Sequence, residues 1–378
     1  MYDMTLTQEE QLMIQSVREF AETVIKPAAK KADETGEFPW DVINKGVELG
    51  LHALPVPEEH GGPGLSSVMT AVIAEEMSKA CAGIGTTLGA TGLSCYPVVI
   101  AGNEAQKKLF FDFIMGGKMG AFCLTEPNAG SDSGSVATTA VRDGDEYVLN
   151  GSKTFITNGG VASVYTVFAT VDRAKGLKGL SAFIVERDRA GVAVGKEENK
   201  MGIRASNTTD VIFENVRIPA DHLLGKEGDG FKIAMLTLDK SRPSVGAQAV
   251  GICQAALDAC VVYVNERKQF GKPIAANQAI QFMLADMAIQ TEAARWLVRR
   301  AAYLQDAGQP FSKEAAMAKT FAGDTAMKVT TDAVQIFGGY GYSRDYPIEK
   351  LMRDAKIMQI FEGTNQIQRV VIAGQLLR

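Results

Sequence analysis

The sequence predicts an α+β protein in which a middle antiparallel β domain stands between two helical regions. The chain has 378 residues, more than a single hydrophobic core usually serves. Apolar residues recur with a helical period in the first and last thirds and alternate in short runs between them. We therefore expect an N-terminal helical domain at 1–119, a middle antiparallel β domain at 120–228 and a C-terminal helical bundle at 229–378.

The N-terminal region begins with a predicted amphipathic helix. Thr7 stands three residues before Glu10, a spacing typical of a capping box. Apolar residues then recur at steps of three and four up to Pro27, where we expect the helix to end. Proline and glycine predict a loop over 55–64, and a second helix should cover 66–79.

An uncharged segment at 80–103 is long enough to cross a bilayer. It contains so many glycines and threonines that we predict buried helices of a soluble domain instead. The chain reaches Glu9 and Glu10 before any apolar run, which predicts no secretory signal. We expect a cytoplasmic protein with no membrane partner.

Short runs of β-branched and aromatic residues predict the strands of the middle domain. The runs are 136–141, 147–149, 153–157, 164–171, 181–185 and 208–213. The turns predicted between them contain Asp143-Gly144, Asn150-Gly151, Asn158-Gly159-Gly160 and Lys178-Gly179. Such spacing is typical of a small antiparallel sheet.

Helical periodicity returns from residue 231 and predicts the closing bundle. One helix face is traced by Val245, Ala249, Ile252, Ala256, Ala259 and Tyr263. A second is traced by Ile280, Leu284, Met287, Ala294, Val298 and Ala301.

Composition argues against several classes of protein. The net charge is -5 without a Lys/Arg block, whereas nucleic-acid binding needs clustered positive charge. The five cysteines have no CxxC or Cys/His ligand spacing, so we expect reduced core thiols. The three histidines are far apart in sequence, and we expect no metal site. They are His52, His60 and His222.

A single carboxylate, Glu362, stands at a glycine-containing break between two amphipathic helical pieces near the C-terminus. The apolar pair Ile360 and Phe361 precedes it and would partly desolvate it. Desolvation raises the pKa of a carboxyl group, as a general base for a weak carbon acid requires. Gly363 would let a ligand pass close to the backbone. The alternative is an ordinary solvated glutamate.

Two further stretches suggest ligand contacts. Residues 122–132 run from a strand into a turn rich in Pro, Gly, Ser and Asp, which suits the polar edge of a flat heterocycle and an anion. Its alternative is a hairpin loop without function. At the head of a bundle helix, Arg242 would pair with phosphate and Asp239 would accept an adenine or pantetheine hydrogen bond. Their alternative is a surface ion pair.

Several motifs together resemble the acyl-CoA dehydrogenase family, in order and spacing and over essentially the whole chain. The motifs are 122–132 (FCLTEPNAGSD), 155–159 (FITNG), 201–206 (MGIRAS), 266–271 (ERKQFG), 335–342 (QIFGGYGY) and 361–364 (FEGT). The likeness is greatest to the short-chain or butyryl-CoA branch, including the type found in anaerobic bacteria.

The resemblance implies one FAD per subunit, a C-terminal four-helix bundle and a homotetramer made of two dimers. By this analogy, the isoalloxazine ring would be lined by Phe122, Leu124, Thr125, Phe155 and Thr157, with Thr157 at its N5 edge. The pyrophosphate and adenosine half of an FAD shared across the dimer contact would be held by Arg267, Phe270, Gln278, Gln335 and Gly339.

The same analogy implies roles around Glu362, which would be the catalytic base. Thr364 and Gln366 would contact FAD beside it. The CoA substrate would be bound by Ser131, Asp239, Arg242 and Gly363, with Ser131 also close to the cofactor. Glu362 would remove the α-proton of the thioester while the β-hydride passes to the flavin. Its backbone N–H and a flavin ribityl hydroxyl would stabilise the charge on the thioester oxygen.

The resemblance leaves the physiological reaction open. The implied reaction is dehydrogenation of a short-chain acyl-CoA to a trans-2-enoyl-CoA, with electrons passing to an electron-transfer flavoprotein. The same site run backwards is an enoyl-CoA reductase, coupled to an electron-bifurcating flavoprotein. Phe361 replaces the usual Tyr, and Lys240-Ser241 replaces the Gly-Gly common in short-chain members, so a larger or aryl-acryloyl group is also a possible substrate.

The alternative from another class is a non-catalytic relative that binds acyl-CoA or nucleic acid. Glu362 and the acidic balance argue against it.

Overall fold

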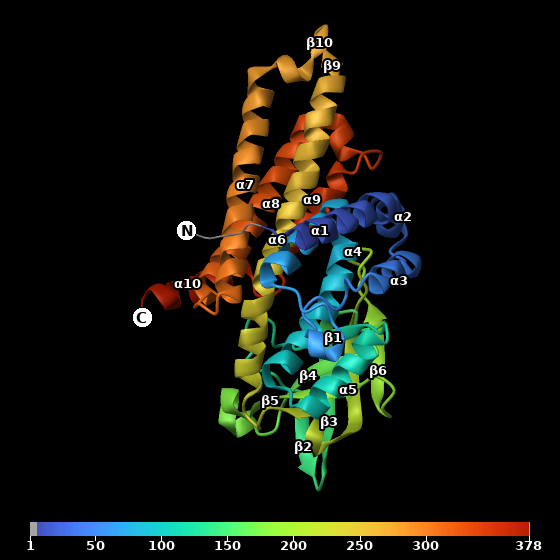
Figure 1. Ribbon diagram of the computed structural model, residues 1–378, viewed down its shortest axis with the longest axis vertical. Coiled ribbons are helices and arrows are strands. Elements are labelled where there is room, and N and C mark those ends of the chain that lie inside the picture. The colour runs from blue at the N-terminus through green and yellow to red at the C-terminus, as the bar shows by residue number, and fades with distance from the viewer. Residues whose placement is uncertain (1–5, 378) are drawn as a thin grey trace.

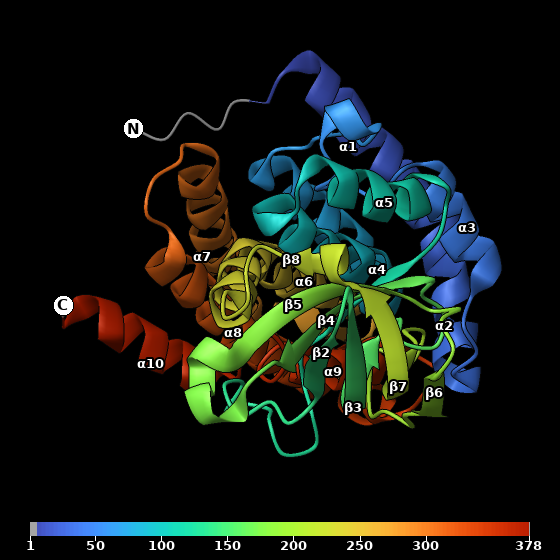
Figure 2. The same ribbon diagram turned by 90° about the horizontal axis from the view of Figure 1, so that it is seen from below.

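The computed structural model describes residues 6–377 of the chain. Figure 1 shows an elongated molecule in which the β-sheet lies at the lower end and the C-terminal helices extend to the upper end. Seen from below, the sheet lies against helices from both helical regions (Figure 2). The predicted order of helices, sheet and helices is confirmed. Residues 1–5, which contributed to the prediction of no secretory signal, lie outside the described range.

The N-terminal region is helical, and its first helix is capped as predicted. The elements are α1 (Gln8–Phe20), the π-helix η1 (Ala21–Ile25), α2 (Lys26–Thr35), α3 (Trp40–Glu48), the 3₁₀ helix η2 (Glu58–His60), α4 (Ser67–Ala101) and α5 (Glu104–Met115). The Thr7 hydroxyl accepts a hydrogen bond from the Glu10 N–H at 3.2 Å, and the Glu10 carboxylate accepts one from the Thr7 N–H at 2.8 Å. The predicted end near Pro27 is wrong. A π-helical turn leads into α2, and Pro27 sits in its first turn, where a missing N–H is tolerated.

Helix α4 contains most of the uncharged segment and is kinked at Cys81 (φ -161°, ψ 112°). Both α4 and α6 (Gly230–Glu266) are long and apolar enough to cross a membrane by length and composition. Within each helix, 61% of the apolar window is buried inside the protein. That burial agrees with the prediction of buried core helices for 80–103.

The middle region forms an eight-stranded sheet with the order β6-β7-β3-β2-β4-β5-β8, in which β1 pairs with β4. Its strands are β1 (Gly120–Cys123), β2 (Thr139–Asp143), β3 (Glu146–Thr157), β4 (Val164–Thr170), β5 (Leu180–Glu186), β6 (Val192–Glu197), β7 (Thr208–Pro219) and β8 (Leu223–Leu224), with 3₁₀ helices η3 (Arg173–Gly179) and η4 (Ala220–His222). Most pairings are antiparallel, as predicted. The β1–β4 and β2–β4 pairings are parallel, because the long connections after β1 and β2 let the chain return in the same direction.

The predicted turns have different outcomes. Gly144 (φ 63°) lies in the hairpin between β2 and β3, as predicted. Asn150-Gly151, predicted to separate two strands, lies inside β3, so that prediction is wrong. The register of β3 against β7 shifts between Leu149 and Gly151, which marks a bulge. A Cβ at Gly151 would lie 2.4 Å from the Thr138 hydroxyl, so glycine is needed for close approach of the neighbouring segment.

Long helices form the C-terminal bundle. After α6 come β9 (Lys268–Gln269), β10 (Lys272–Pro273), the 3₁₀ helix η5 (Ile274–Ala276), α7 (Gln278–Asp306), α8 (Ser312–Phe337), the 3₁₀ helix η6 (Gly338–Tyr342), α9 (Ile348–Ile357) and α10 (Asn365–Leu376). Most members of the two predicted faces are buried in one core, and the others pack against it. The buried ones are Val245, Ala249, Ile252, Ala256, Tyr263, Met287, Ala294, Val298 and Ala301.

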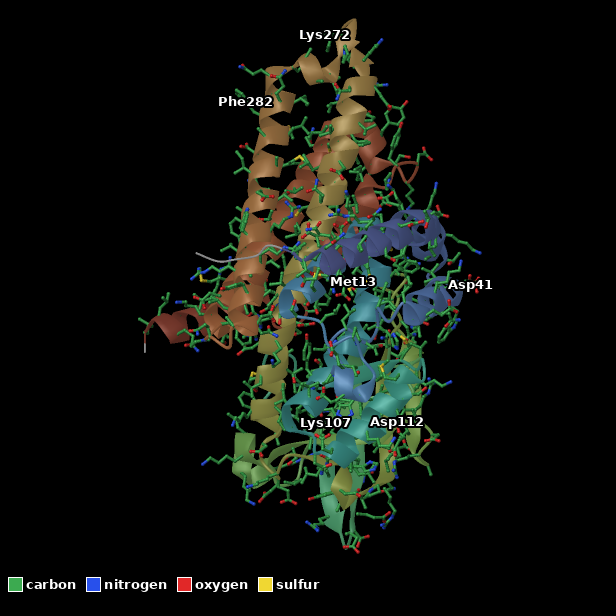
Figure 3. All side chains as sticks on the ribbon, viewed as in Figure 1. Met13, Asp41, Lys107, Asp112, Lys272 and Phe282 are labelled. Carbon is green, nitrogen blue, oxygen red and sulfur yellow. The ribbon has the colours of Figure 1, made fainter. Side chains whose placement is uncertain are left out.

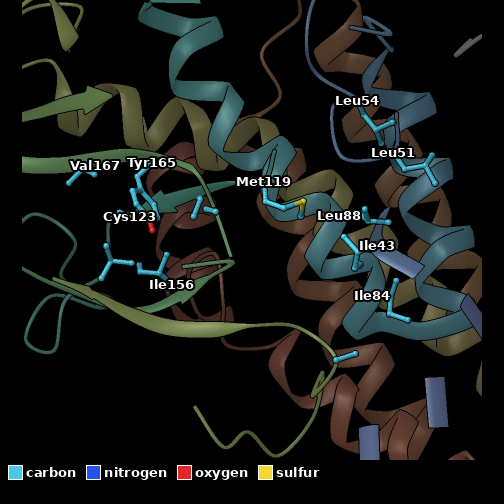
Figure 4. Close-up of a cluster of buried hydrophobic side chains, with 14 of the residues drawn as sticks. Ile43, Leu51, Leu54, Ile84, Leu88, Met119, Cys123, Ile156, Tyr165 and Val167 are labelled. Carbon is cyan, nitrogen blue, oxygen red and sulfur yellow. The ribbon is translucent and has the colours of Figure 1, made fainter. Parts of the chain in front are cut away.

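A second core joins the N-terminal helices to the sheet. Figure 4 shows Ile43, Ile84 and Leu88 together among the helices, Cys123 and Tyr165 in the sheet, and Met119 between the two groups. All five cysteines are buried and free, as predicted. This core fixes β1 and β3 against α4.

A buried ion pair fixes the turn that follows β1. Lys153 of β3 donates to the Glu126 carboxylate at 2.7 Å and to the Leu124 carbonyl at 3.1 Å. Their side chains are 0% and 5% exposed. The Glu126 carboxylate also accepts hydrogen bonds from the Ala137 and Thr138 N–H groups. Because it joins three segments, this pair holds the turn at 124–138 against β3.

We expect Glu126→Ala to lower the free energy of unfolding by about 3–5 kcal/mol, because it leaves a buried lysine without its counter-charge. Urea unfolding followed by circular dichroism measures this. The matched control is Glu146→Ala, whose exposed pair with Arg217 lies in the same sheet and should contribute about 0–1 kcal/mol. Equal losses in the two variants would contradict the importance of the buried pair.

Candidate active site

Glu362 lies in a tight turn between α9 and α10. The Thr364 side chain caps α10 by accepting a hydrogen bond from the Ile367 N–H at 3.2 Å. Glu362 (φ 52°) and Gly363 (φ 89°) both have left-handed backbone conformations. A positive φ is strained for a residue with a long side chain and persists only where the surroundings stabilise it. Such strain is common at functional sites.

Hydrogen bonds on the inner side of the turn hold this conformation. Gln368 Nε2 donates to the carbonyl oxygens of Glu362 at 3.1 Å and Gly363 at 3.0 Å. Lys319 of α8 donates to the Gly363 carbonyl at 2.8 Å. A Cβ at Gly363 would lie 2.6 Å from Gln368 Nε2. Glycine here therefore makes room for Gln368, a packing reason beside the predicted one of ligand access.

The Glu362 carboxylate faces α6, where the Ser241 hydroxyl donates a hydrogen bond to it. Burial raises the pKa of Glu362, and this effect exceeds the lowering caused by the Ser241 hydrogen bond and the charges of Arg242 and Lys319. The residue keeps some solvent exposure, although protein surrounds its carboxylate. The expected partial desolvation is present, and the alternative of an ordinary solvated glutamate is wrong.

Asp239 and Arg242 form an ion pair one turn apart on α6. Arg242 is only 3% exposed, so the alternative of a surface pair is wrong. Its charge acts on Glu362. Among the described residues, the buried Arg242 Nε finds no hydrogen-bond partner. A buried N–H without a partner is a donor available to a ligand.

The residues predicted to line the ring lie on two neighbouring segments of the sheet. They are Phe122, Leu124, Thr125, Phe155 and Thr157. The Thr154 N–H donates to the Thr125 carbonyl at 2.9 Å and joins the two segments. The β3 register shifts between Lys153 and Ile156, and within this bulge Phe155 (φ 55°) is 63% exposed. An exposed aromatic ring beside threonine hydroxyls suits a flat ring with a polar edge.

The residues predicted to hold the nucleotide half lie toward the other end of the molecule. They are Arg267, Phe270, Gln278, Gln335 and Gly339. The guanidinium of Arg267 lies 5.3 Å from the centre of the Tyr340 ring, in a pocket of about 530 Å³ that Gly339 also lines. Phe270 is 99% exposed at the tip of the β9–β10 hairpin, whose position Lys272 marks in Figure 3. One chain therefore keeps the two predicted groups apart (Figure 1).

The remaining predicted residues lie in turns and helix ends. Thr364 is the N-cap of α10, and Gln366 is exposed in the first turn of that helix, so both directly follow the Glu362 turn. Ser131 is exposed in the turn after β1. Thr364 and Gln366 therefore lie next to the candidate base along the chain, whereas Ser131 lies in the sheet region.

Sequence reasoning missed three side chains that hold the candidate base. Ser241 was considered only as a departure from the Gly-Gly of short-chain members, and Lys319 and Gln368 were not considered. Lys319 stands among alanines on the buried face of α8, and a lone charge on such a face was the available signal. The contact of Ser241 with Glu362 joins positions 121 residues apart and has no local signal.

This arrangement can take a proton from a weak carbon acid. A desolvated carboxylate has a raised proton affinity, and a hydroxyl donor orients it. Across residues 6–377, no group of three or more His, Cys, Asp and Glu side chains could hold a metal ion. General base chemistry is the reaction type that these groups support.

Comparison with known proteins matches the whole chain. Models described as acyl-CoA dehydrogenase N-terminal, middle and C-terminal domains match residues 7–118, 121–216 and 228–377. The acryloyl-CoA reductase (NADH) of Anaerotignum propionicum is 48% identical over 379 residues, covering 100% of this chain and 96% of the relative. Butyryl-CoA dehydrogenase from Megasphaera elsdenii has a TM-score of 0.97 and 47% identity, with both chains fully covered. A structure described as the electron transferring flavoprotein of Acidaminococcus fermentans contains a fully covered chain with the same TM-score and 50% identity.

We expect Ser241→Ala to raise the pKa of Glu362, because it removes a hydrogen bond that favours the ionised carboxylate. Infrared titration of the carboxyl band, assigned with Glu362→Gln, measures the change. Ser244→Ala, one turn further along α6, is the control and should leave the band unmoved. An unchanged pKa in Ser241→Ala would show that the hydroxyl does not tune the carboxylate.

Proposed function

The chain belongs to the acyl-CoA dehydrogenase family, and we propose that it catalyses FAD-dependent α,β-dehydrogenation of a short-chain, butyryl-like acyl-CoA to a trans-2-enoyl-CoA. The observation that carries the proposal is the desolvated Glu362 carboxylate, held in a strained turn and oriented by Ser241. The similarity to butyryl-CoA dehydrogenase from M. elsdenii over both whole chains supports the short-chain substrate.

The residues of this chain suit FAD, the cofactor of the family. Exposed Phe155 and the neighbouring threonines fit a flat ring with a polar edge, and the pocket at Arg267 offers a cation beside aromatic rings for the nucleotide half. When bound, FAD supplies the hydride acceptor. We assign Phe122, Leu124, Thr125, Phe155 and Thr157 to the ring, and Arg267, Phe270, Gln278, Gln335 and Gly339 to the nucleotide half.

Glu362 has the central role in the proposed reaction. Its carboxylate takes the α-proton of the thioester, the β-hydrogen leaves with its electron pair as a hydride, and the C–C bond becomes a double bond. The Glu362 N–H would donate to the thioester oxygen, where negative charge develops. Arg242 and Asp239 stay assigned to the CoA substrate, and the unpartnered Arg242 Nε is the donor that supports this.

The proposal also covers partners, assembly and compartment. Similarity to a chain in the electron transferring flavoprotein structure from A. fermentans supports an electron-transfer flavoprotein as partner. We propose a homotetramer made of two dimers, as the family resemblance implies, and the β9–β10 hairpin at the far end of the molecule from the sheet supports an FAD shared across the dimer contact (Figure 1). A cytoplasmic location and domain boundaries at 119/120 and 228/229 complete the proposal.

A second candidate is the reverse reaction. The 48% identity to the acryloyl-CoA reductase (NADH) of A. propionicum supports physiological enoyl-CoA reduction. This candidate includes a larger or aryl-acryloyl substrate and a bifurcating flavoprotein as partner, and the description of the A. fermentans structure, which names electron bifurcation, supports that partner. The same base then returns the proton to the α-carbon.

The first experiment is anaerobic titration of the purified holoenzyme with butyryl-CoA. We expect rapid bleaching of the oxidised-flavin absorbance. Bound flavin without bleaching would shift the proposal to larger or unsaturated substrates, tested with enoyl-CoAs on the reduced enzyme. A protein that cannot take up FAD would contradict the whole proposal.

We expect Glu362→Gln to slow flavin reduction by at least about 10²–10⁴-fold, the usual contribution of a general base, while FAD stays bound. In the unmodified enzyme the base must be ionised, and its pKa is raised. The reduction rate should therefore fall as pH decreases through that raised pKa. Stopped-flow absorbance across pH measures both effects, with FAD content as the control. Normal reduction in the Gln variant would show that another group is the base.

A further inference from the structure

Lys319 of α8 is a buried cation directly beneath the turn that carries Glu362. It is 1% exposed. Its ammonium donates to the Gly363 carbonyl at 2.8 Å and to the Asn365 side-chain oxygen at 3.0 Å. Asn365 in turn donates to the Thr320 carbonyl and the Asp324 carboxylate on the same helix. Lys319 is therefore joined to both sides of the turn that carries the base.

Lys319 is buried without a carboxylate among its hydrogen-bond acceptors, so a direct ion pair does not explain its burial. Burying a lysine is unfavourable unless it is paired, yet both of its hydrogen-bond acceptors are neutral. The charges that act on its pKa are those of Glu362 in the turn, Arg242 on α6 and Asp324 on α8. Arg242 is paired with Asp239, and Asp324 with Arg369 of α10. Of the two carboxylates that act on Lys319, Glu362 is the one that has no ion pair among the described residues, because its carboxylate is bonded to the neutral Ser241 hydroxyl.

We propose that Lys319 is a positioning residue for the base: it holds the strained Glu362–Gly363 turn, and its positive charge keeps the desolvated Glu362 carboxylate ionised. The first part rests on the bond to the Gly363 carbonyl, which fixes the peptide that follows Glu362. The second rests on the same bond, because it places the ammonium 2.8 Å from the carbonyl oxygen of Gly363, the residue next to Glu362. This inference depends on the proposed function, because it assigns Lys319 a part in that reaction.

The sign of the charge effect follows from the two groups. Burial lowers the pKa of Lys319 to about 8, so the ammonium is charged below that pH. Its charge lowers the pKa of Glu362 and offsets part of the effect of burial. Without the cation, Glu362 would take up a proton at a higher pH, and the pH range in which it can act as a base would shrink from the acid side.

Two substitutions separate the hydrogen bond from the charge. Lys319→Met removes both, whereas Lys319→Gln keeps a donor and removes only the charge. The measurement is the limiting rate of flavin reduction by butyryl-CoA in the holoenzyme, from pH 5 to pH 9. Lys328→Met is the matched control, because Lys328 lies on the same helix with an exposed side chain.

We expect Lys319→Met to lower the limiting reduction rate by about 10- to 100-fold, the size of one charge-assisted hydrogen bond, with little change in the substrate concentration for half saturation. In the pH–rate profile of Lys319→Met, the acid limb, where the rate falls as pH decreases, should move to higher pH. Lys319→Gln should show the same displacement of the acid limb with a smaller loss of rate at high pH. A role in folding alone would not move the acid limb.

An unchanged acid limb in both variants would overturn the proposal, and so would loss of folding or FAD in both. If only Lys319→Met loses FAD, the position of the acid limb in Lys319→Gln tests the proposal. Infrared titration of the Glu362 carboxyl band, without turnover, should show the same rise in its pKa. Failure of the unmodified enzyme to reduce flavin with any acyl-CoA or enoyl-CoA would instead overturn the proposed function.

Discussion

The candidate site depends on one constraint, the inward orientation of the Glu362 and Gly363 carbonyl groups. Bonds from Gln368 and Lys319 hold these carbonyls and offset the strain of a left-handed glutamate. Helix α8 can reach the turn because it packs closely against it: a Cβ at Gly323 would lie 2.7 Å from the Met358 carbonyl oxygen. The conformation of the base is therefore set by how α8, α10 and the turn pack together.

The sheet and the bundle contribute different parts of the proposed cofactor site. The bulge in β3 leaves Phe155 exposed in a strained conformation, and the β9–β10 hairpin does the same to Phe270 (φ 51°) at the other end of the molecule. Exposed aromatic rings on strained backbone lower the stability of an isolated chain. Both rings belong to the groups proposed to contact FAD. We therefore expect bound FAD and the partner chain to cover these rings, which would explain why they are exposed in one chain alone.

The spacing of apolar and turn-forming residues correctly predicted the features that depend on neighbouring residues in the sequence. The faces of α6 and α7, the Thr7 cap and the hairpin at Gly144 follow from spacing and turn residues. The failures arose where tertiary contacts override local preference: Gly151 is a bulge because Thr138 packs against it, and Pro27 lies within a continuing helix. In the site, the desolvation of Glu362 was predicted from the apolar pair before it, but Ile360 of that pair is itself 47% exposed, and the carboxylate is buried against α6. The contacts from Ser241 and Lys319 were not predictable, because each joins residues more than forty positions apart.

A desolvated base must satisfy two opposing requirements. Its pKa must be high enough to take a proton from a carbon acid, yet the group must be ionised before the reaction. A direct ion pair would keep Glu362 ionised but would lower its proton affinity strongly. Arg242 is bonded instead to Asp239, and Lys319 to the Gly363 carbonyl, so both act on Glu362 only through space. The Ser241 hydroxyl bonds the carboxylate directly but carries no charge. Because neither cation is bonded to the carboxylate, the pKa of Glu362 stays raised while their charges favour its ionised form.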